Sequence, residues 1–120
     1  MADNLTILNL ASALARHSSQ RHRVIAENIA NADTPGYRAR DVEAFDAEAM
    51  IRAQRDGDMR SLQGRVAEML IEDVQASPNG NTVGIEDQMV RSTEAQASHD
   101  AAITIYKKSM DLMRMSLGRN

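Results

Sequence analysis

A long, regular spacing pattern near the carboxyl end constrains this chain more than any other feature of its 120 residues. Between residues 85 and 117, marked positions recur in alternating steps of four and three, which is the spacing of a heptad repeat on an α-helix. The positions, most of them apolar or aromatic, are Ile85, Met89, Ser92, Gln96, His99, Ile103, Tyr106, Met110, Met113 and Leu117. A helix over 85–117 would be about 50 Å long. A narrow apolar stripe of that length needs a partner helix of similar length.

The amino-terminal segment is the obvious partner, because residues 5–32 also have helical spacing. Its candidate seam steps by three and four through Leu8, Ala11, Ala15, Ser18, His22, Ile25, Ile29 and Ala32. Two other registers are nearly as regular, since Ile7, Leu10 and Leu14 are apolar too. Both seams have polar side chains near their middle, which predicts a polar layer that sets the alignment of the pair. We therefore expect an all-α fold, with two long terminal helices paired as an antiparallel coiled coil.

The middle of the chain has a different character. Turn-forming strings open it, punctuate it and close it: "DTPGY" from residue 33, "RDGD" from residue 55 and "SPNGNTVG" from residue 77. Between them, 41–54 and 61–74 contain enough apolar residues for short helical pieces. The expected organisation is an N-terminal helix over 1–32, an irregular and partly helical segment over 33–84, and a C-terminal helix over 85–120.

Composition supports packed helices and narrows the possible functions. Aromatic residues make up 2% of the chain and Trp is absent, so the apolar volume comes from Ala, Ile, Leu, Val and eight Met. Strands of sandwiches and barrels prefer β-branched and aromatic residues instead. The absence of Cys excludes disulfides and thiolate chemistry. A net charge of −3 does not indicate nucleic acid, and no run approaches the roughly 18 apolar residues of a membrane span.

The sequence predicts no catalytic site, no cofactor and no metal. It contains no phosphate-binding glycine loop and no spacing that suggests a nucleophile with its base. The histidines His17, His22 and His99 are the remaining metal-ligand candidates. His17 and His22 are five residues apart and share a helix face poorly. His22 and His99 suit a polar layer between the helices better than a metal site.

A polar string, "NIANADTPGYRARD" from Asn28 to Asp41, interrupts the first helix. Pro35 fixes φ at the first central position of a turn, and Gly36 supplies the positive φ that a type II turn needs at the second. The helix should therefore end near Asn31–Asp33. Two interpretations follow from the residues alone. The string is an ordinary helix stop and loop, or it is a docking element that directs Tyr37 and Arg38 at another subunit.

The string "NIANADTPGY" resembles the signature of bacterial flagellar rod and hook proteins. Farther along, "NGNTV" at 79–83 precedes a long helix containing "YKKSMDLMR" at 106–114, and together they are similar to proximal rod subunits of the FlgB type. One departure is Gly84, where the resemblance leads us to expect an acidic residue before the helix. The resemblance implies a tubular assembly whose terminal helices pair as a coiled coil, and export through the flagellar type III apparatus without a cleaved signal.

The resemblance also implies a location, partners and a set of motif residues. It implies a structural role in motility, within the periplasmic rod of the basal body, where the subunit transmits torque. Implied partners are other rod proteins, the MS-ring/rod junction protein, the export gate and further copies in a helical tube. The implied docking residues are Asn28, Ile29, Asn31, Thr34, Pro35, Gly36, Tyr37 and Arg38. The alternative from another class is a soluble helical adaptor that binds one partner by helix-in-groove contacts.

Overall fold

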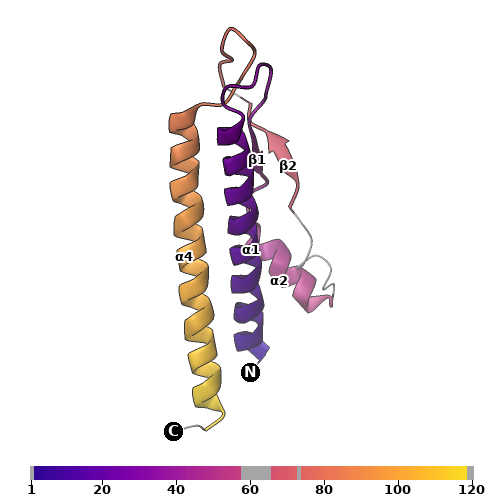
Figure 1. Ribbon diagram of the computed structural model, residues 1–120. Helices are drawn as coiled ribbons and strands as arrows, with labels where there is room; N and C mark the ends of the chain where they lie inside the picture. Colours follow the sequence, from indigo (N-terminus) through magenta and orange to yellow (C-terminus); the bar gives the residue numbers. More distant parts are fainter. Residues whose placement is uncertain (1, 58–65, 73, 119–120) are drawn as a thin grey trace.

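The computed structural model describes residues 2–57, 66–72 and 74–118, and it consists mainly of two long helices. The N-terminal helix α1 spans Ala2–Ala30 and the C-terminal helix α4 spans Ile85–Ser116. They run side by side in opposite directions, which gives an elongated molecule of 63 × 30 × 18 Å (Figure 1). The predicted fold class is confirmed. Among the described helices, none has the combined length and hydropathy needed to cross a membrane.

Small side chains form the contact between the two helices. On α4, the residues buried in the contact are spaced seven apart: Gln88, Ala95, Ala102 and Ser109. On α1, the buried residues Ala11, Ser18 and Ile25 follow the same spacing. Alanine and serine side chains are short, so the two helix axes can approach closely along most of their length.

The predicted seam of α4 is therefore displaced by about one residue from the observed contact. Ile85, Met89, Ile103, Tyr106, Met110 and Leu117 are exposed, and Met113 is half-buried. The prediction followed the largest apolar side chains, whereas the contact uses the smallest ones. On α1, the predicted seam residues Ala11 and Ile25 are buried, Leu8 and Ala15 are half-buried, and Ile29 is exposed.

The expected polar layer in the middle of the pair is also replaced by contacts within each helix. The Ser18 hydroxyl donates to the backbone carbonyl of Leu14, and the Gln96 amide donates to Asp100. The polar contacts that do join the helices directly are the hydrogen bond between Asn28 and Gln88, near one end of the pair, and the 3.4 Å hydrogen bond that Arg21 donates to Glu94.

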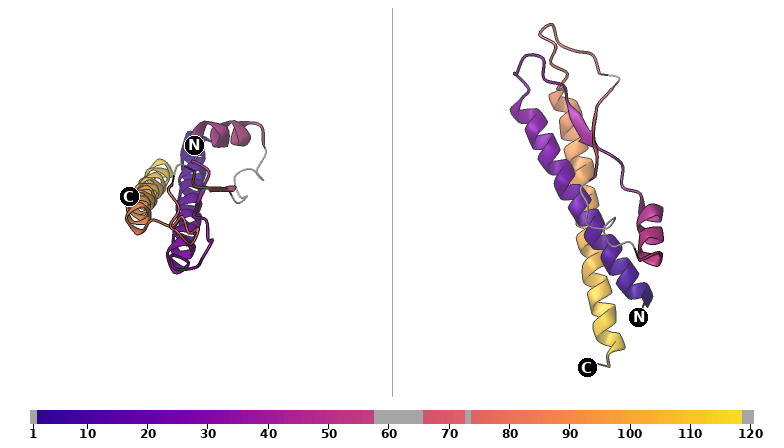
Figure 2. Two further views of the ribbon diagram at one scale, coloured as in Figure 1. Left: turned by 90° about the horizontal axis from the view of Figure 1, so that it is seen from above. Right: turned by 90° about the vertical axis from the view of Figure 1, so that its right-hand side faces the viewer.

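The middle segment forms a two-stranded ribbon and one short helix. Strand β1 (Arg40–Val42) pairs antiparallel with β2 (Glu68–Leu70), with Asp41 opposite Met69. The helix α2 spans Ala47–Arg55, and its N-cap carboxylate, Asp46, accepts from the backbone N–H of Ala49. The α2 and α4 helices lie on opposite sides of α1 (Figure 1, Figure 2).

Two predictions for this segment need correction. The first helical piece, predicted from residue 41, begins at Ala47, because 40–42 pairs with β2 instead. The second, predicted over 61–74, is extended at 68–70, while 58–65 and 73 lie outside the described residues. Short apolar runs fit strand and helix equally well, so the pairing partner decides between them.

Enlarging a small residue in the helix contact should destabilise the chain. Ala102 is fully buried and Ala101 beside it is exposed. We expect Ala102→Leu to lower the free energy of unfolding by about 1–3 kcal/mol, because the added methylenes force the helices apart. The matched variant Ala101→Leu should change it by less than about 0.5 kcal/mol. Thermal unfolding followed by circular dichroism measures both, and equal effects would contradict the assigned contact.

Candidate functional site

The side-chain amide of Asn28, in the last turn of α1, makes all the hydrogen bonds available to it. Its Oδ1 accepts from the backbone N–H of Arg40 at 3.1 Å and from the Tyr37 hydroxyl at 3.4 Å. Its Nδ2 donates to the Arg40 carbonyl at 2.7 Å and to Gln88 Oε1 at 3.0 Å. A carboxamide has two donor hydrogens and two acceptor lone pairs, so Asn28 is saturated while 0% exposed. It joins α1, the following loop, β1 and α4.

The turn after α1 has the predicted form. The Tyr37 backbone N–H donates to the Thr34 carbonyl at 3.2 Å, and Gly36 has φ of 76°. A positive φ at the third residue of a four-residue turn is the mark of type II. The turn is held from inside by Asn31, whose Oδ1 accepts from the Thr34 hydroxyl at 3.1 Å and whose Nδ2 donates to the Glu27 carbonyl at 2.8 Å.

A second asparagine, Asn81, ties the loop before α4 to the loop after α1. Its Nδ2 donates to the carbonyls of Asn31 at 2.9 Å and Thr34 at 2.7 Å. Its Oδ1 accepts from the backbone N–H of Val83 at 2.7 Å, which shapes its own loop. Asn81 is 3% exposed. We call Asn28, Asn31, Asn81 and Gln88 the amide cluster.

Backbone contacts reinforce this junction between the two loops. The Gly36 N–H donates to the Asn79 carbonyl at 2.9 Å, and the Thr82 N–H donates to the Tyr37 carbonyl at 3.0 Å. A Cβ built on Gly80 would lie 3.4 Å from Gly36 Cα, so the two glycines allow the loops to meet backbone to backbone. The string "NADTPGY" at 31–37 and the string "NGNT" at 79–82, far apart in the sequence, therefore bind each other.

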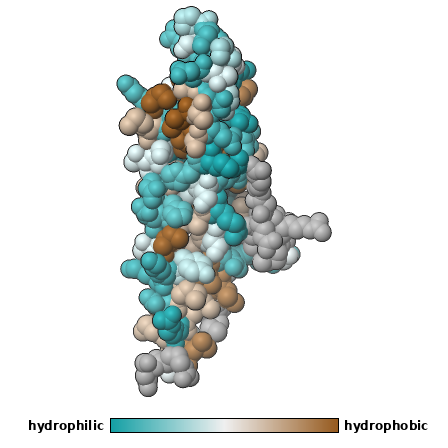
Figure 3. All heavy atoms as spheres, viewed as in Figure 1, coloured by the Kyte–Doolittle hydropathy of each residue, from teal (hydrophilic) through white to brown (hydrophobic). Residues whose placement is uncertain are grey.

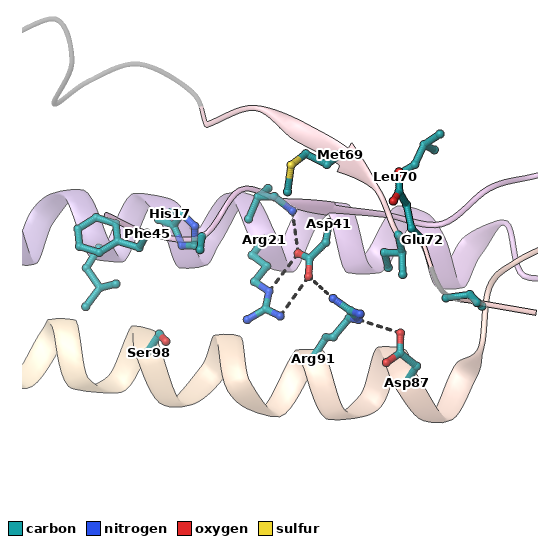
Figure 4. Close-up of a pocket in the computed structure, with 15 residues that line it drawn as sticks. His17, Arg21, Asp41, Phe45, Met69, Leu70, Glu72, Asp87, Arg91 and Ser98 are labelled. Atoms are coloured by element: carbon teal, nitrogen blue, oxygen red, sulfur yellow. Dashed lines mark hydrogen bonds and ion pairs between the residues drawn. The ribbon is translucent and has the colours of Figure 1, made fainter. Parts of the chain in front are cut away.

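A buried carboxylate connects β1 to both long helices (Figure 4). Asp41 accepts two hydrogen bonds from the Arg21 guanidinium, each 3.1 Å long, and a further one from Arg91 of α4. Arg91 also pairs with Asp87 at 2.8 Å. Burial raises the pKa of Asp41, but hydrogen bonds from Arg21, the Val42 N–H and Arg91 outweigh it, so the pKa lies below its ordinary value.

Side chains on one face of α1 form hydrogen bonds with backbone groups that lie next to the two strands of the ribbon. The Gln20 amide pairs with both backbone groups of Val66, donating to its carbonyl at 2.6 Å and accepting from its N–H at 3.0 Å. His17 Nε2 lies 2.7 Å from the carbonyl oxygen of Glu43. His17, Gln20 and Asn28 are separated by steps of three and eight residues, so they lie on one side of the helix.

Between α1, α4 and the ribbon lies an open groove of about 640 Å³. Its wall is mixed: Leu14, Phe45 and Leu70 are apolar, while Arg21, Asp41 and Arg91 form the ion cluster described above (Figure 4). The described residues include no group of three or more His, Asp or Glu side chains placed to hold a metal ion. The guanidinium groups of Arg21 and Arg91 are paired with carboxylates, and these ion pairs join α1, β1 and α4.

The structure divides the predicted docking residues into two groups. Asn28, Asn31 and Tyr37 turn inward and form contacts within the chain. The exposed residues of the set are Ile29 in the last turn of α1 and Thr34, Pro35, Gly36 and Arg38 in the loop that follows. Sequence reasoning missed Gln88, Arg21, Asp41 and Arg91. Gln88 is fully buried near the start of α4, and its Nε2 has no partner among the described residues.

Comparison with known proteins identifies the class to which these paired helices and their asparagine-rich junction belong. Residues 7–38 match the family described as flagella basal body rod protein. The chain is 30% identical over 106 residues to the flagellar basal body rod protein FlgB of Bacillus subtilis (strain 168), covering 82% of this chain and 81% of the relative. It is 29% identical over 127 residues to the protein of that name from Agrobacterium fabrum (strain C58 / ATCC 33970), covering 96% and 95%. The chain belongs to the FlgB family of flagellar basal body rod proteins.

A shorter and more similar match concerns the protein of the same name from Escherichia coli (strain K12). There the identity is 52% over 44 residues, covering 37% of this chain and 31% of the relative. The family match at 7–38 contains most of α1 and the turn that follows it. The amide of Asn28 and the glycine turn at Gly36 thus both fall within the matched segment.

Removing the Asn28 amide should disconnect four elements at once. Asn28→Ala leaves buried groups of Arg40 and Gln88 without partners, and we expect a loss of about 2–4 kcal/mol in the free energy of unfolding. Asn31→Ala is the control, because Asn31 is half-exposed and water can replace its contacts; a loss of about 1 kcal/mol or less is expected. Urea unfolding measures both. Equal losses would show that the Asn28 amide contributes no more to stability than the Asn31 amide does.

The ion cluster of Arg21, Asp41 and Arg91 should make the free energy of unfolding depend on pH. The pKa of Asp41 is lower in the folded chain than in the unfolded chain, so its stabilisation is complete above about pH 4 and is lost as the pH falls through the folded value. Asp41→Asn removes that charge at every pH. We expect the variant to be less stable by about 1–3 kcal/mol at neutral pH. The difference from wild type should shrink below about pH 4.

Urea unfolding at neutral pH and in acid measures this difference. Asp111→Asn, at an exposed position of α4, is the matched control and should unfold like wild type at both pH values. A difference between wild type and Asp41→Asn that stays constant with pH would show that the carboxylate charge is not its source.

Proposed function

We propose that this chain is a structural subunit of the proximal flagellar rod, and that its role is mechanical rather than catalytic. Family membership carries this proposal. The shape agrees with it, because a 63 Å helical pair closed at one end is a stiff element that spans distance rather than enclosing a substrate. In this role the subunit joins the membrane-embedded ring and export gate to the rest of the rod and passes torque outward.

The amide cluster suits a part that bears load. Force along the axis tends to slide two antiparallel helices past each other, and small side chains alone resist sliding weakly. Asn28 and Asn81 tie the upper ends of α1 and α4 through directional hydrogen bonds, and Asp41 ties both helices to β1. Directional bonds break when the register shifts, so they hold the two helices in one alignment.

The proposed partners follow from the surface that the chain leaves uncovered. Large apolar side chains are exposed on both long helices, which in a soluble monomer is an unusual amount of apolar surface. They include Leu5, Ile7, Ile29, Val90, Ile105, Leu112 and Met115. We infer that other rod proteins, the MS-ring/rod junction protein, the export gate and further copies cover parts of this surface after type III export. The assembled location is then the periplasmic rod of the basal body.

The exposed part of the motif is the candidate docking tip. Thr34, Pro35 and Arg38 stand on the turn that Asn31 and Asn81 hold rigid, so a neighbour would meet a preformed surface. A preformed surface binds with less loss of conformational entropy than a flexible loop. This reading combines both interpretations of the string: its inward residues stop the helix, and its outward residues are free for a partner.

The adaptor function remains the second candidate because of the groove between α1, α4 and the ribbon. An adaptor would bind one partner and would not enter basal bodies. The two functions separate in a strain whose own copy is deleted. Expression of the chain should restore swimming, and purified basal bodies should contain it in the rod. A motile strain whose basal bodies lack the chain would contradict the rod function.

Docking at the tip is tested by reversing one charge. Arg38 is exposed, so Arg38→Glu should leave the unfolding midpoint unchanged within about 0.5 kcal/mol. We expect less chain in purified basal bodies and slower swimming, because the tip meets its neighbour with the wrong charge. Arg55→Glu, at an exposed position of α2, is the control. Normal basal-body content in Arg38→Glu would exclude the tip as a docking surface.

A further inference from the structure

The loop before α4 contains the dipeptide Asn79-Gly80, a sequence that is chemically labile in proteins. Asparagine is a thermolabile residue, and it reacts fastest when glycine follows it, because glycine has no side chain to hinder attack by its own amide nitrogen. The sequence contains no other asparagine that precedes a glycine. Asn79 is therefore the asparagine at which such a reaction is expected first.

The reaction is a ring closure followed by hydrolysis. The Gly80 amide nitrogen attacks the carboxamide carbon of Asn79, a new C–N bond forms, and the old carboxamide C–N bond breaks. The Gly80 nitrogen loses its proton to water, and the departing group takes up a proton and leaves as ammonia. Water then opens the five-membered imide at one of its two carbonyls. One opening gives aspartate, and the other gives isoaspartate.

Three hydrogen bonds hold this dipeptide in the folded chain. The Gly80 N–H donates to the Ser77 carbonyl at 2.8 Å, so the proton that must leave is engaged. The Asn79 Oδ1 accepts from the Asn81 N–H at 3.0 Å. The Asn79 carbonyl accepts from the Gly36 N–H at 2.9 Å. These bonds fix the carboxamide and the peptide group that follows it, whereas ring closure requires one of them to turn toward the other.

Shielding from water does not protect this site. Asn79 and Gly80 are both exposed, in one of the two loops at the upper end of the molecule, where the surface is largely hydrophilic (Figure 1, Figure 3). Water reaches the dipeptide, so its protection comes from the hydrogen bonds and from the close approach of Gly80 to Gly36. Both exist only while the string at 31–37 binds the string at 79–82. We call this contact the loop junction.

The two products have different consequences for the loop junction. Aspartate keeps the backbone unchanged and offers a carboxylate oxygen to the Asn81 N–H. Isoaspartate carries the chain through the side-chain carbon, which inserts a methylene before Gly80. It also converts the carbonyl that accepts from Gly36 into a free carboxylate. The glycine contact and the hydrogen bonds of Asn81 to the first loop then lose their alignment.

We propose that Asn79 is a site of spontaneous deamidation and isomerisation, that the closed loop junction protects it, and that isomerisation prevents the junction from closing again. This inference is independent of the proposed rod function. It makes the loop junction a point at which damage is irreversible. A chain kept open accumulates isoaspartate at residue 79, whereas a closed chain keeps its asparagine.

The protection is tested on the full chain at mildly alkaline pH, in native buffer and in urea, with deamidation at Asn79 followed by peptide mass spectrometry. In native buffer the wild-type chain should react about tenfold or more slowly than in urea, because only open molecules react. Asn81→Ala removes two hydrogen bonds between the loops and should react several-fold faster than wild type in native buffer. Gln96→Ala, at an exposed position of α4, is the matched control and should react like wild type.

The rates in urea should agree among all three chains, which shows that the substitutions leave the reactivity of the dipeptide itself unchanged. Equal rates for wild type in native buffer and in urea would overturn the proposal. An Asn81→Ala chain that reacts no faster than wild type in native buffer would overturn it as well.

The effect of isomerisation is tested on the isoaspartate form, separated from the reacted chain by ion-exchange chromatography. It should unfold at a clearly lower urea concentration than Asn79→Asp, which has the same added charge without the inserted methylene. Asn79→Asp should itself unfold like wild type. An isoaspartate form that unfolds together with Asn79→Asp would show that the loop junction closes in spite of the methylene, and it would overturn the proposed irreversibility.

Discussion

The carboxamide of Asn28 is the point on which the rest of this fold depends. It meets both backbone groups of Arg40, the Tyr37 hydroxyl and the Gln88 amide, and it has no capacity left for water. Few side chains can do this, because the group must donate twice and accept twice within one small volume. An aspartate would lose both donors and bury a charge, and a leucine would leave three partners unpaired. The helix register, the course of the loop and the position of β1 are thereby fixed by one residue.

The chain uses polar ties of this kind because its apolar side chains are small or face outward. Its core is built from Ala11, Ala95, Ala102 and a few branched residues, so burial contributes less per contact than in a core of Leu and Phe. Asp41 compensates by bonding to Arg21 and Arg91 on opposite helices, and Gln20 by pairing with the backbone of Val66. Polar ties are directional and apolar ones are not. A fold held in this way has one defined shape even though many of its large apolar side chains are exposed.

The sequence predicted the parts of the structure that follow from local rules. Heptad spacing placed both long helices, and Pro35 with Gly36 placed the turn, because these signals act within a few residues. The predicted seam of α4 was wrong because the contact with α1 buries Ala95 and Ala102 instead of Met89 and Ile103. Small side chains of this kind contribute little to a hydropathy pattern. The sequence did not predict the two-stranded ribbon, because residues 68–70 become a strand only by pairing with β1. The roles of Gln88 and Asp41 depend on partners at least 20 positions away in the chain, which no local pattern encodes.

The distance along the chain between Asn28 and Gln88 has a consequence for the order in which the molecule is completed. The two residues are 60 positions apart, and a polypeptide is made from its amino end. While the first 80 or so residues exist alone, the last turn of α1 has its asparagine side chains but neither Asn81 nor Gln88 to receive them. Helix α1 therefore has no partner helix until the later residues of the chain have been synthesised. The last turn of α1 can bind the first turn of α4 only after that turn has been made. A chain that stops before it cannot adopt the complete fold.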